Sequence, residues 1–349
     1  MSRPRLWTLG LTAWMLPATL GCGAAASEPT PEAARVAPRD PPRARATTIE
    51  MAITVDDLPL HGPDYVGIDR VAIADALLRA FAAHRVPRVY GFVNGARLDE
   101  HPESIEVLRH WVVAGNPLGN HTYSHISLND APVDRYLADL ERGEDVLRRL
   151  IPNPQTWKVF RYPYLFEGPD LEKRNAVRGW LAAHRYAIAE VSVDGDDWAW
   201  NPVFARCSDA HDDAALDVLR DGMVKTHIDE LRFMRNTTRE LSGGREVPQI
   251  LLMHIGAADA YAIDALLTAF EAEGVRFIEL EQALADPFYA QDPASPSRAG
   301  AAFPYAVARS RGVRLPELPE RPEEEALDSM CLAAPPGRAL PALGPRANP

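Results

Sequence analysis

The feature that most constrains the fold is an alternation of short apolar strand segments and amphipathic helical segments between residues 49 and 287. The run "IEMAITVDD" is β-branched and apolar, residues 67–85 have helical apolar spacing, and "RVYGFV" is a second strand. The pattern continues with helices near 102–114, 133–150, 170–184 and 259–273, and with strands near 157–160, "YAIAEVSV", "VPQILLMHI" and "VRFIEL". Such strand–helix repeats predict a parallel α/β sheet, closed into a barrel or doubly wound.

One segment departs from this rhythm. Residues 209–241 carry an apolar stripe at helical spacing, formed by Leu216, Leu219, Met223, Leu231 and Met234. The stripe predicts one long helix that packs into the core. A lid or a partner-binding face is the alternative.

Composition narrows the classes of function. With 46% hydrophobic and 25% charged residues the chain can bury a sizeable core. The net charge of -12 argues against nucleic acid as a partner, because phosphate binding needs clustered Lys and Arg. Anionic membrane surfaces are disfavoured for the same reason.

The first 22 residues have the layout of a secretory signal peptide, with Arg3 and Arg5 before an apolar run and then small residues. We therefore expect an exported protein, either a cell envelope lipoprotein or a periplasmic or secreted one. Cys22 after "TLG" resembles the lipidated cysteine of lipoproteins, although Thr19 stands where Leu is usual. A simple signal peptide cut near "GAAAS" is the alternative. Residues 23–48 predict a Pro/Ala-rich linker.

The C-terminal part is rich in proline, with 12 prolines between residues 287 and 349. Because proline opposes regular structure, residues 288–349 predict a tail that is partly wrapped on the domain. Two cysteines, Cys207 and Cys331, remain beyond Cys22, and an oxidising compartment permits them to pair. Nothing in the sequence shows that they meet.

Chemically reactive side chains follow the predicted strands, at the end where parallel folds gather their functional groups. The first strand ends in Asp56 and Asp57, "LGN" precedes His121 and His125, and "QILLM" precedes His254. An isolated Asp pair usually just opens a loop, and an isolated His at a strand end is usually a core residue. Together, however, they suggest the hypothesis that one carboxylate binds a metal while its neighbour reaches the bound water.

Five motifs occur in the order typical of one enzyme family: "TVDD", "HTYSH", "RYPY", "DGDDW" and "LMH". With them the chain resembles the polysaccharide deacetylases of the NodB homology type, carbohydrate esterase family 4. The resemblance runs from about residue 49 to 287, which we take as the catalytic domain. It implies a distorted (β/α) barrel of about seven strands.

The resemblance also implies roles for individual residues. Asp57, His121 and His125 correspond to the metal ligands, with zinc as the default metal and cobalt, nickel, manganese or iron as alternatives. Asp56 corresponds to the base that takes a proton from the attacking water, and Arg161 would hold that carboxylate.

The remaining roles concern the substrate side of the site. The Tyr164 backbone N–H corresponds to the oxyanion donor, His254 to the general acid, and Asp194 to the residue that orients His254, with a lesser role for Asp197. Trp198 would form a wall of the groove. Three more aromatic residues could face sugar rings or lie in the core: Tyr123, Tyr162 and Trp200.

The sequence departs from the family pattern at two places. Leu58 and Leu165 stand where the family usually has Gly, and Pro59 follows Leu58. Both changes add bulk beside the groove and favour a narrower or shorter substrate. His61 lies nearby and has no assigned counterpart.

The sequence therefore predicts a metal-dependent hydrolase that removes N-acetyl groups from an acetylated glycan, either peptidoglycan or a chitin-like oligosaccharide. One alternative is an O-acetyl esterase acting on acetylxylan-type polysaccharide. Another is a non-catalytic glycan-binding protein of the cell envelope.

Overall fold

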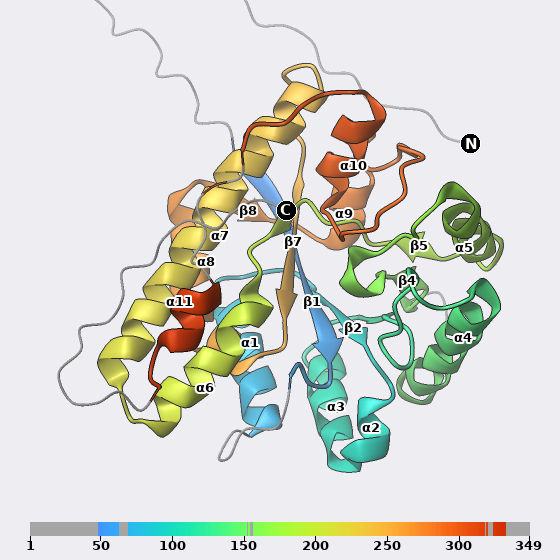
Figure 1. The fold of residues 1–349 in the computed structure, drawn as a ribbon. Helices are drawn as coiled ribbons and strands as arrows, with labels where there is room; N and C mark the ends of the chain where they lie inside the picture. Colours follow the sequence, from blue (N-terminus) through green and yellow to red (C-terminus); the bar gives the residue numbers. More distant parts are fainter. Residues whose placement is uncertain are drawn as a thin grey trace, which may run out of the picture. The chain divides into compact units, whose positions relative to one another are not determined.

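Strand β1 (Ile49–Leu58) is the strand around which the sheet is built. It pairs in parallel with β2 (Tyr90–Val93), β7 (Gln249–His254) and β8 (Val275–Phe277). Neighbours on both sides and helices over its faces bury nearly every residue of β1, which explains its unbroken apolar run. In the computed structural model β1 and β7 lie side by side at the centre, with helices on the outside (Figure 1).

The structure describes residues 48–62, 69–151, 153, 156–317, 319 and 324–332. These residues form part of one compact unit, Ala46–Pro349. The remaining strands are β3 (Leu118–Asn120), β4 (Val159–Phe160), β5 (Ala187–Ile188) and β6 (Val193–Asp194). The helices are α1 (Arg70–Ala83), α2 (Arg97–Glu100), α3 (Ile105–Val113), α4 (Val133–Leu150), α5 (Leu171–Ala183), α6 (Asn201–Asp209), α7 (Asp213–Leu241), α8 (Ala257–Ala272), α9 (Leu280–Leu284), α10 (Phe303–Ser310) and α11 (Glu324–Ser329).

The sheet is a curled, all-parallel barrel with one break. Its strand order is β5-β4-β3-β2-β1-β7-β6, and β8 pairs with β1 off this path. The predicted strand "YAIAEVSV" is divided in two, because β5 pairs with β4 at one edge and β6 pairs with β7 at the other. Residues 189–192 cross between the edges, so the break lies within one continuous stretch of chain. The prediction of a distorted barrel of about seven strands is confirmed.

The long helix predicted in residues 209–241 is confirmed and packs into the core, but it begins later than predicted. Helix α7 begins at Asp213, because the Asp212 side chain accepts a hydrogen bond from the Ala215 N–H and caps it. All five residues of the predicted stripe are buried: Leu216, Leu219, Met223, Leu231 and Met234.

The described part of the Pro-rich C-terminal region packs on the barrel. Phe288, Tyr289 and Phe303 are buried in one apolar cluster with residues of β2 and β7. Among the described residues, no helix has both the length and the apolarity that crossing a membrane requires. The predicted signal peptide (1–22), Cys22 and the linker up to residue 47 lie outside the described residues.

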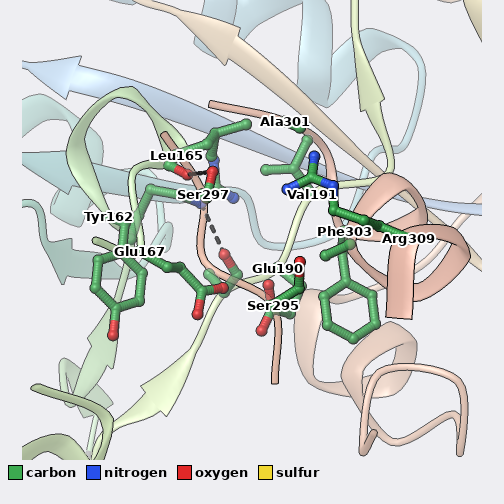
Figure 2. Close-up of a pocket in the computed structure, with 13 residues that line it drawn as sticks. Tyr162, Leu165, Glu167, Glu190, Val191, Ser295, Ser297, Ala301, Phe303 and Arg309 are labelled. Atoms are coloured by element: carbon green, nitrogen blue, oxygen red, sulfur yellow. Dashed lines mark hydrogen bonds between the residues drawn. The ribbon is translucent and has the colours of Figure 1, made fainter. Parts of the chain in front are cut away.

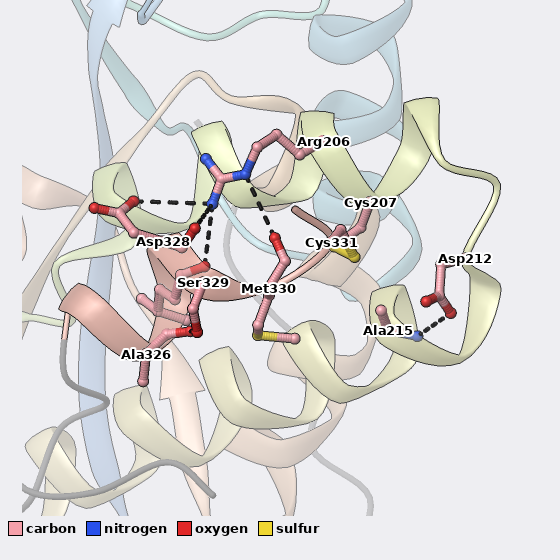
Figure 3. The surroundings of a disulfide bond; sticks show 10 residues. Arg206, Cys207, Asp212, Ala215, Ala326, Asp328, Ser329, Met330 and Cys331 are labelled. Atoms are coloured by element: carbon pink, nitrogen blue, oxygen red, sulfur yellow. Dashed lines mark hydrogen bonds and ion pairs between the residues drawn. A yellow bond between two sulfur atoms is a disulfide. The ribbon is translucent and has the colours of Figure 1, made fainter. Parts of the chain in front are cut away.

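A disulfide joins the C-terminal region to the body of the domain. Cys207 on α6 and Cys331, 124 residues later, are bonded (Figure 3). Around them Leu327 and Met330 are buried against α6, and the Arg206 guanidinium donates to the Leu327 carbonyl. The bond therefore fastens α11 onto α6.

We expect Cys331→Ser to lower the free energy of unfolding by about 2–5 kcal/mol, because the disulfide restricts the unfolded chain over a long loop. Equilibrium denaturation of the variant and of Ser329→Ala, a control on α11, measures the effect. Reduced wild type should match Cys331→Ser. Equal stability of the oxidised wild type and Cys331→Ser would contradict a stabilising disulfide.

Candidate active site

The parallel strands bring the predicted site residues to one end of the barrel. The register of β1 and β7 places Asp56 directly beside His254. His121 and Arg161 each follow the last residue of their strands, Asn120 of β3 and Phe160 of β4, which are themselves paired. Strand pairing alone thus gathers groups that lie up to 198 positions apart in the sequence.

Asp56 and Asp57 lie on the same side although they are neighbours on one strand. Adjacent strand residues normally point to opposite faces. Here Asp57 has a left-handed backbone (φ 65°), and the register of β1 against β2 shifts between Val55 and Leu58. As a result, both carboxylates come within 3.6 Å of His121 Nε2.

Asp57, His121 and His125 converge as metal ligands would. Oδ1 of Asp57 lies 3.6 Å from His121 Nε2 and 3.4 Å from His125 Nε2, and the three ligand atoms lie within 4.8 Å of one another. That Oδ1 is buried and has no hydrogen-bond partner among the described residues. An orphaned buried carboxylate oxygen facing two imidazole nitrogens fits a divalent cation.

The protonation states of these groups suit the same role. Burial lowers the pKa of both His121 and His125 to about 4, so each imidazole is neutral at pH 7. Burial favours the neutral form of Asp57, but His125 and His61 outweigh it and hold its pKa well below the usual range. A carboxylate and two neutral imidazoles are the forms that bind metal. The His121 Nδ1–H donates to the Arg161 carbonyl (2.8 Å), which leaves Nε2 as the ligand atom.

His61, which the sequence left without a role, contacts the other oxygen of Asp57. Its Nδ1 lies 2.7 Å from Asp57 Oδ2, and its ring centroid lies 4.8 Å from that of His254. Asp57, His61 and His254 form a second group with metal-ligand spacing. Because Oδ2 is already hydrogen-bonded to His61, the first group fits a divalent cation better than the second.

Arg161 holds Asp56, as predicted. Its Nη1 donates to both oxygens of Asp56 (3.1 Å each), its Nη2 donates to Thr54 Oγ1 (2.9 Å), and its Nε donates to the Ala189 carbonyl (2.8 Å). Burial raises the pKa of Asp56 to about 6, and the guanidinium partly offsets the rise. Asp56 is thus ionised at neutral pH and basic enough to accept a proton.

The acid that orients His254 is Asp197, and the prediction of Asp194 for this role is corrected. Asp197 Oδ1 lies 2.6 Å from His254 Nδ1, and its Oδ2 accepts from the His254 backbone N–H at 2.6 Å. Burial opposes protonation of His254, but Asp197 raises its pKa well above the usual value. Asp194 instead accepts from the Asp196 N–H, and burial together with Asp196 raises its pKa to about 7.

A further buried carboxyl group near Asp197, that of Asp259, was not predicted. Asp259 on α8 is fully buried, and its Oδ2 accepts from the Asn201 side chain of α6 (3.1 Å). Burial and the nearby Asp197 raise the pKa of Asp259 well above its usual value. The only sequence signal was an Asp in the first turn of an apolar helix, which normally indicates dipole stabilisation.

The site opens into a cavity of about 390 Å³. Tyr164 and Trp198 line it and are 52% and 40% exposed, so both can offer an aromatic face to a ligand. Asp194 lines it as well. The three other aromatic candidates, Tyr123, Tyr162 and Trp200, are buried in the core and cannot contact a sugar.

Comparison with known proteins agrees with this geometry. Residues 44–178 match the family model of polysaccharide deacetylase, and this range contains Asp56, both predicted histidine ligands and Arg161. This part of the chain is similar to the polysaccharide deacetylase family. Asp197 and His254 lie beyond the matched range, and their place beside the other candidate residues rests on the structure.

The chain is also similar to individual deacetylases. The peptidoglycan-N-acetylglucosamine deacetylase of Bacillus cereus is 30% identical over 149 residues, which are 43% of this chain and 46% of that protein. The chain thus spans about half the length of this relative. Among solved structures, the peptidoglycan deacetylase PdaC from Bacillus subtilis is 20% identical (69% of this chain, 92% of that chain, TM-score 0.42). A polysaccharide deacetylase from Bacillus cereus is 18% identical (66% and 91%, TM-score 0.46).

We expect His125→Ala to weaken zinc binding by more than about 100-fold, because removing a ligand costs more than removing its supporting contact. Isothermal titration of the metal-stripped protein measures it, and His110→Ala, at an exposed histidine of α3, is the control. His61→Ala should weaken binding by only about 10- to 100-fold. Loss of binding in His61→Ala but not in His125→Ala would place the metal in the second group.

Proposed function

We propose that this chain is a metal-dependent hydrolase that removes N-acetyl groups from an acetylated glycan of the peptidoglycan or chitin type. The observation that carries the proposal is the convergence of three units on one cavity: the ligand set around Asp57, the Asp56–Arg161 pair and the Asp197–His254 pair. The similarity to a peptidoglycan-N-acetylglucosamine deacetylase supports the N-acetyl substrate.

The residues divide the work of amide hydrolysis. A divalent cation, for which we propose zinc, supplies Lewis acidity and makes water nucleophilic at neutral pH. Asp56, fixed by Arg161, accepts the proton of the attacking water at its carboxylate. His254, whose Nδ1 is held by Asp197, presents Nε2 as the donor that protonates the leaving nitrogen. We propose the Tyr164 peptide N–H as a donor to the developing oxyanion, with Trp198 and the Tyr164 ring bordering the sugar.

We also propose that the protein is exported. The layout of residues 1–22 supports this proposal, and so does the Cys207–Cys331 disulfide, since such bonds persist in oxidising compartments.

Acetate release tests the activity. The full chain, metal-stripped and then reloaded with zinc or cobalt, should release acetate from N-acetylated chitin oligosaccharides or peptidoglycan and should fail to do so when stripped. Asp56→Asn should lower kcat by about 10²- to 10⁴-fold, while Asp99→Asn, at an exposed carboxylate, should not. Release from acetylxylan alone would replace the N-acetyl substrate with an O-acetyl ester. Zinc uptake without acetate from any of the three would leave a glycan-binding protein.

A matched pair of variants tests the general acid. Asp197→Asn should lower kcat on the N-acetylated glycan by about 10²- to 10⁴-fold, because the amide cannot stabilise the His254 imidazolium. Hydrolysis of an acetate ester should fall less, since an alkoxide leaves more readily than an amide nitrogen. Asp194→Asn should cost less than Asp197→Asn on the glycan. Equal or larger loss in Asp194→Asn would return the orienting role to Asp194.

A further inference from the structure

Two consecutive residues of the candidate site have left-handed backbones without being glycine. Tyr164 has φ 59° and Leu165 has φ 54°, in the short 3₁₀ turn Pro163–Leu165 that follows β4. Side chains with a Cβ are disfavoured there, and such strain persists only where the surroundings impose it. Contacts with other residues must therefore hold the turn Pro163–Leu165 in this conformation.

The segment Ser295–Gly300, from the Pro-rich C-terminal region, contacts the turn directly. The Ser297 hydroxyl donates to the Leu165 carbonyl (3.1 Å), as Figure 2 shows. The Ser297 N–H donates to the Gly168 carbonyl (3.0 Å) in an isolated antiparallel bridge. Gly300 packs so closely on Tyr164 that a Cβ there would overlap the Tyr164 carbonyl oxygen.

The segment is itself anchored to the barrel at several points. The Asn129 side chain, in the loop after the two histidine ligands, donates to the Arg298 carbonyl (2.9 Å). The Arg298 guanidinium donates to the Pro169 carbonyl (2.9 Å), and Arg309 on α10 donates to the Pro296 carbonyl (2.9 Å). The segment is thus bonded on both sides of the turn and to the following helix.

The same segment reaches the cavity. Ala299 and Gly300 line it together with Asp57, His125 and Tyr164. Ser295, Ser297 and Leu165 border a second, small cavity of about 30 Å³ (Figure 2). Arg161 also lines this cavity. The segment therefore borders both cavities.

We propose that Ser295–Gly300 is a positioning element of the active site, in which Ser297 and Gly300 hold Tyr164 and Leu165 in their left-handed conformation. The element thereby fixes the direction of the Tyr164 peptide N–H. This inference rests on the proposed function, in which that N–H donates to the oxyanion.

A glycine pair provides the first test. Gly300 and Gly312 both have left-handed backbones (φ 56° and 64°), but a Cβ at Gly312 would meet nothing within 4 Å. In the zinc-loaded full chain, Gly300→Ala should lower kcat on the N-acetylated glycan by about tenfold or more with KM changed by less than about threefold, since a displaced oxyanion donor weakens only the transition state. Gly312→Ala should leave kcat unchanged.

A rescue provides the second test. Ser297→Ala should lower kcat by about tenfold, while Ser310→Ala, which removes a comparable hydroxyl–carbonyl bond to Val307, should not. Glycine adopts the left-handed conformation without a supporting contact. In a Leu165→Gly background, Ser297→Ala should therefore change kcat by less than about threefold. A loss that persists fully in that background would overturn the inference.

Hydrogen exchange keeps the inference testable apart from turnover. Amides of residues 164–168 should exchange faster in Ser297→Ala than in Ser310→Ala, with equal thermal stability. Wild-type activity together with unchanged exchange and kcat in the Ser297 and Gly300 variants would overturn the positioning role alone. If the wild type released no acetate, the proposed function would be overturned. The hydrogen-exchange result would then decide whether Ser297 holds the turn Pro163–Leu165.

Discussion

The interaction on which the site depends is the buried ion pair between Arg161 and Asp56. Both side chains are at most 3% exposed, and the guanidinium uses all three of its nitrogens: on Asp56, on Thr54 of β1 and on the Ala189 carbonyl at the barrel break. The backbone carbonyl of the same residue fixes the tautomer of His121. Removing one partner of such a pair typically costs about 3–5 kcal/mol, because the other charge is left buried. One arginine thus couples the proposed base, a proposed metal ligand and the segment that crosses the barrel break.

The site is built on strained backbone rather than on flexible glycine. Six residues in or beside it are left-handed and not glycine: Asp57, Thr122, His125, Tyr164, Leu165 and Asp196. Each turns the chain sharply at a strand end or in the loop after it, which lets neighbouring side chains point at one centre. Strain of this kind persists where the surrounding structure imposes it. For Asp57 the His61 contact contributes, and for Leu165 the Ser297 hydroxyl does.

The described residues of the C-terminal region pack against the barrel and border the site. Helix α11 is bonded through Cys331 to α6, the helix that directly follows the turn carrying Asp197 and Trp198. Upstream of α11, Ala299 and Gly300 line the cavity, and Ser297 donates to the Leu165 carbonyl beside it. Proline limits regular secondary structure in this region, but it does not prevent apolar side chains such as Phe288 and Phe303 from being buried.

The sequence by itself determined the parallel α/β pattern and the groups at the strand ends, because side-chain periodicity needs only local information, and the resemblance of its five motifs chose the barrel over the doubly wound alternative. It therefore predicted Asp56, Asp57, His121, His125, Arg161 and His254 at one centre. It assigned Asp194 rather than Asp197 to His254, because the left-handed turn at Asp196 and the contact between Asp197 and His254 Nδ1 are not visible in the local sequence. It could not tell buried Tyr162 from exposed Tyr164, or find Ser297, because burial and contacts across 132 positions exist only once the barrel has closed.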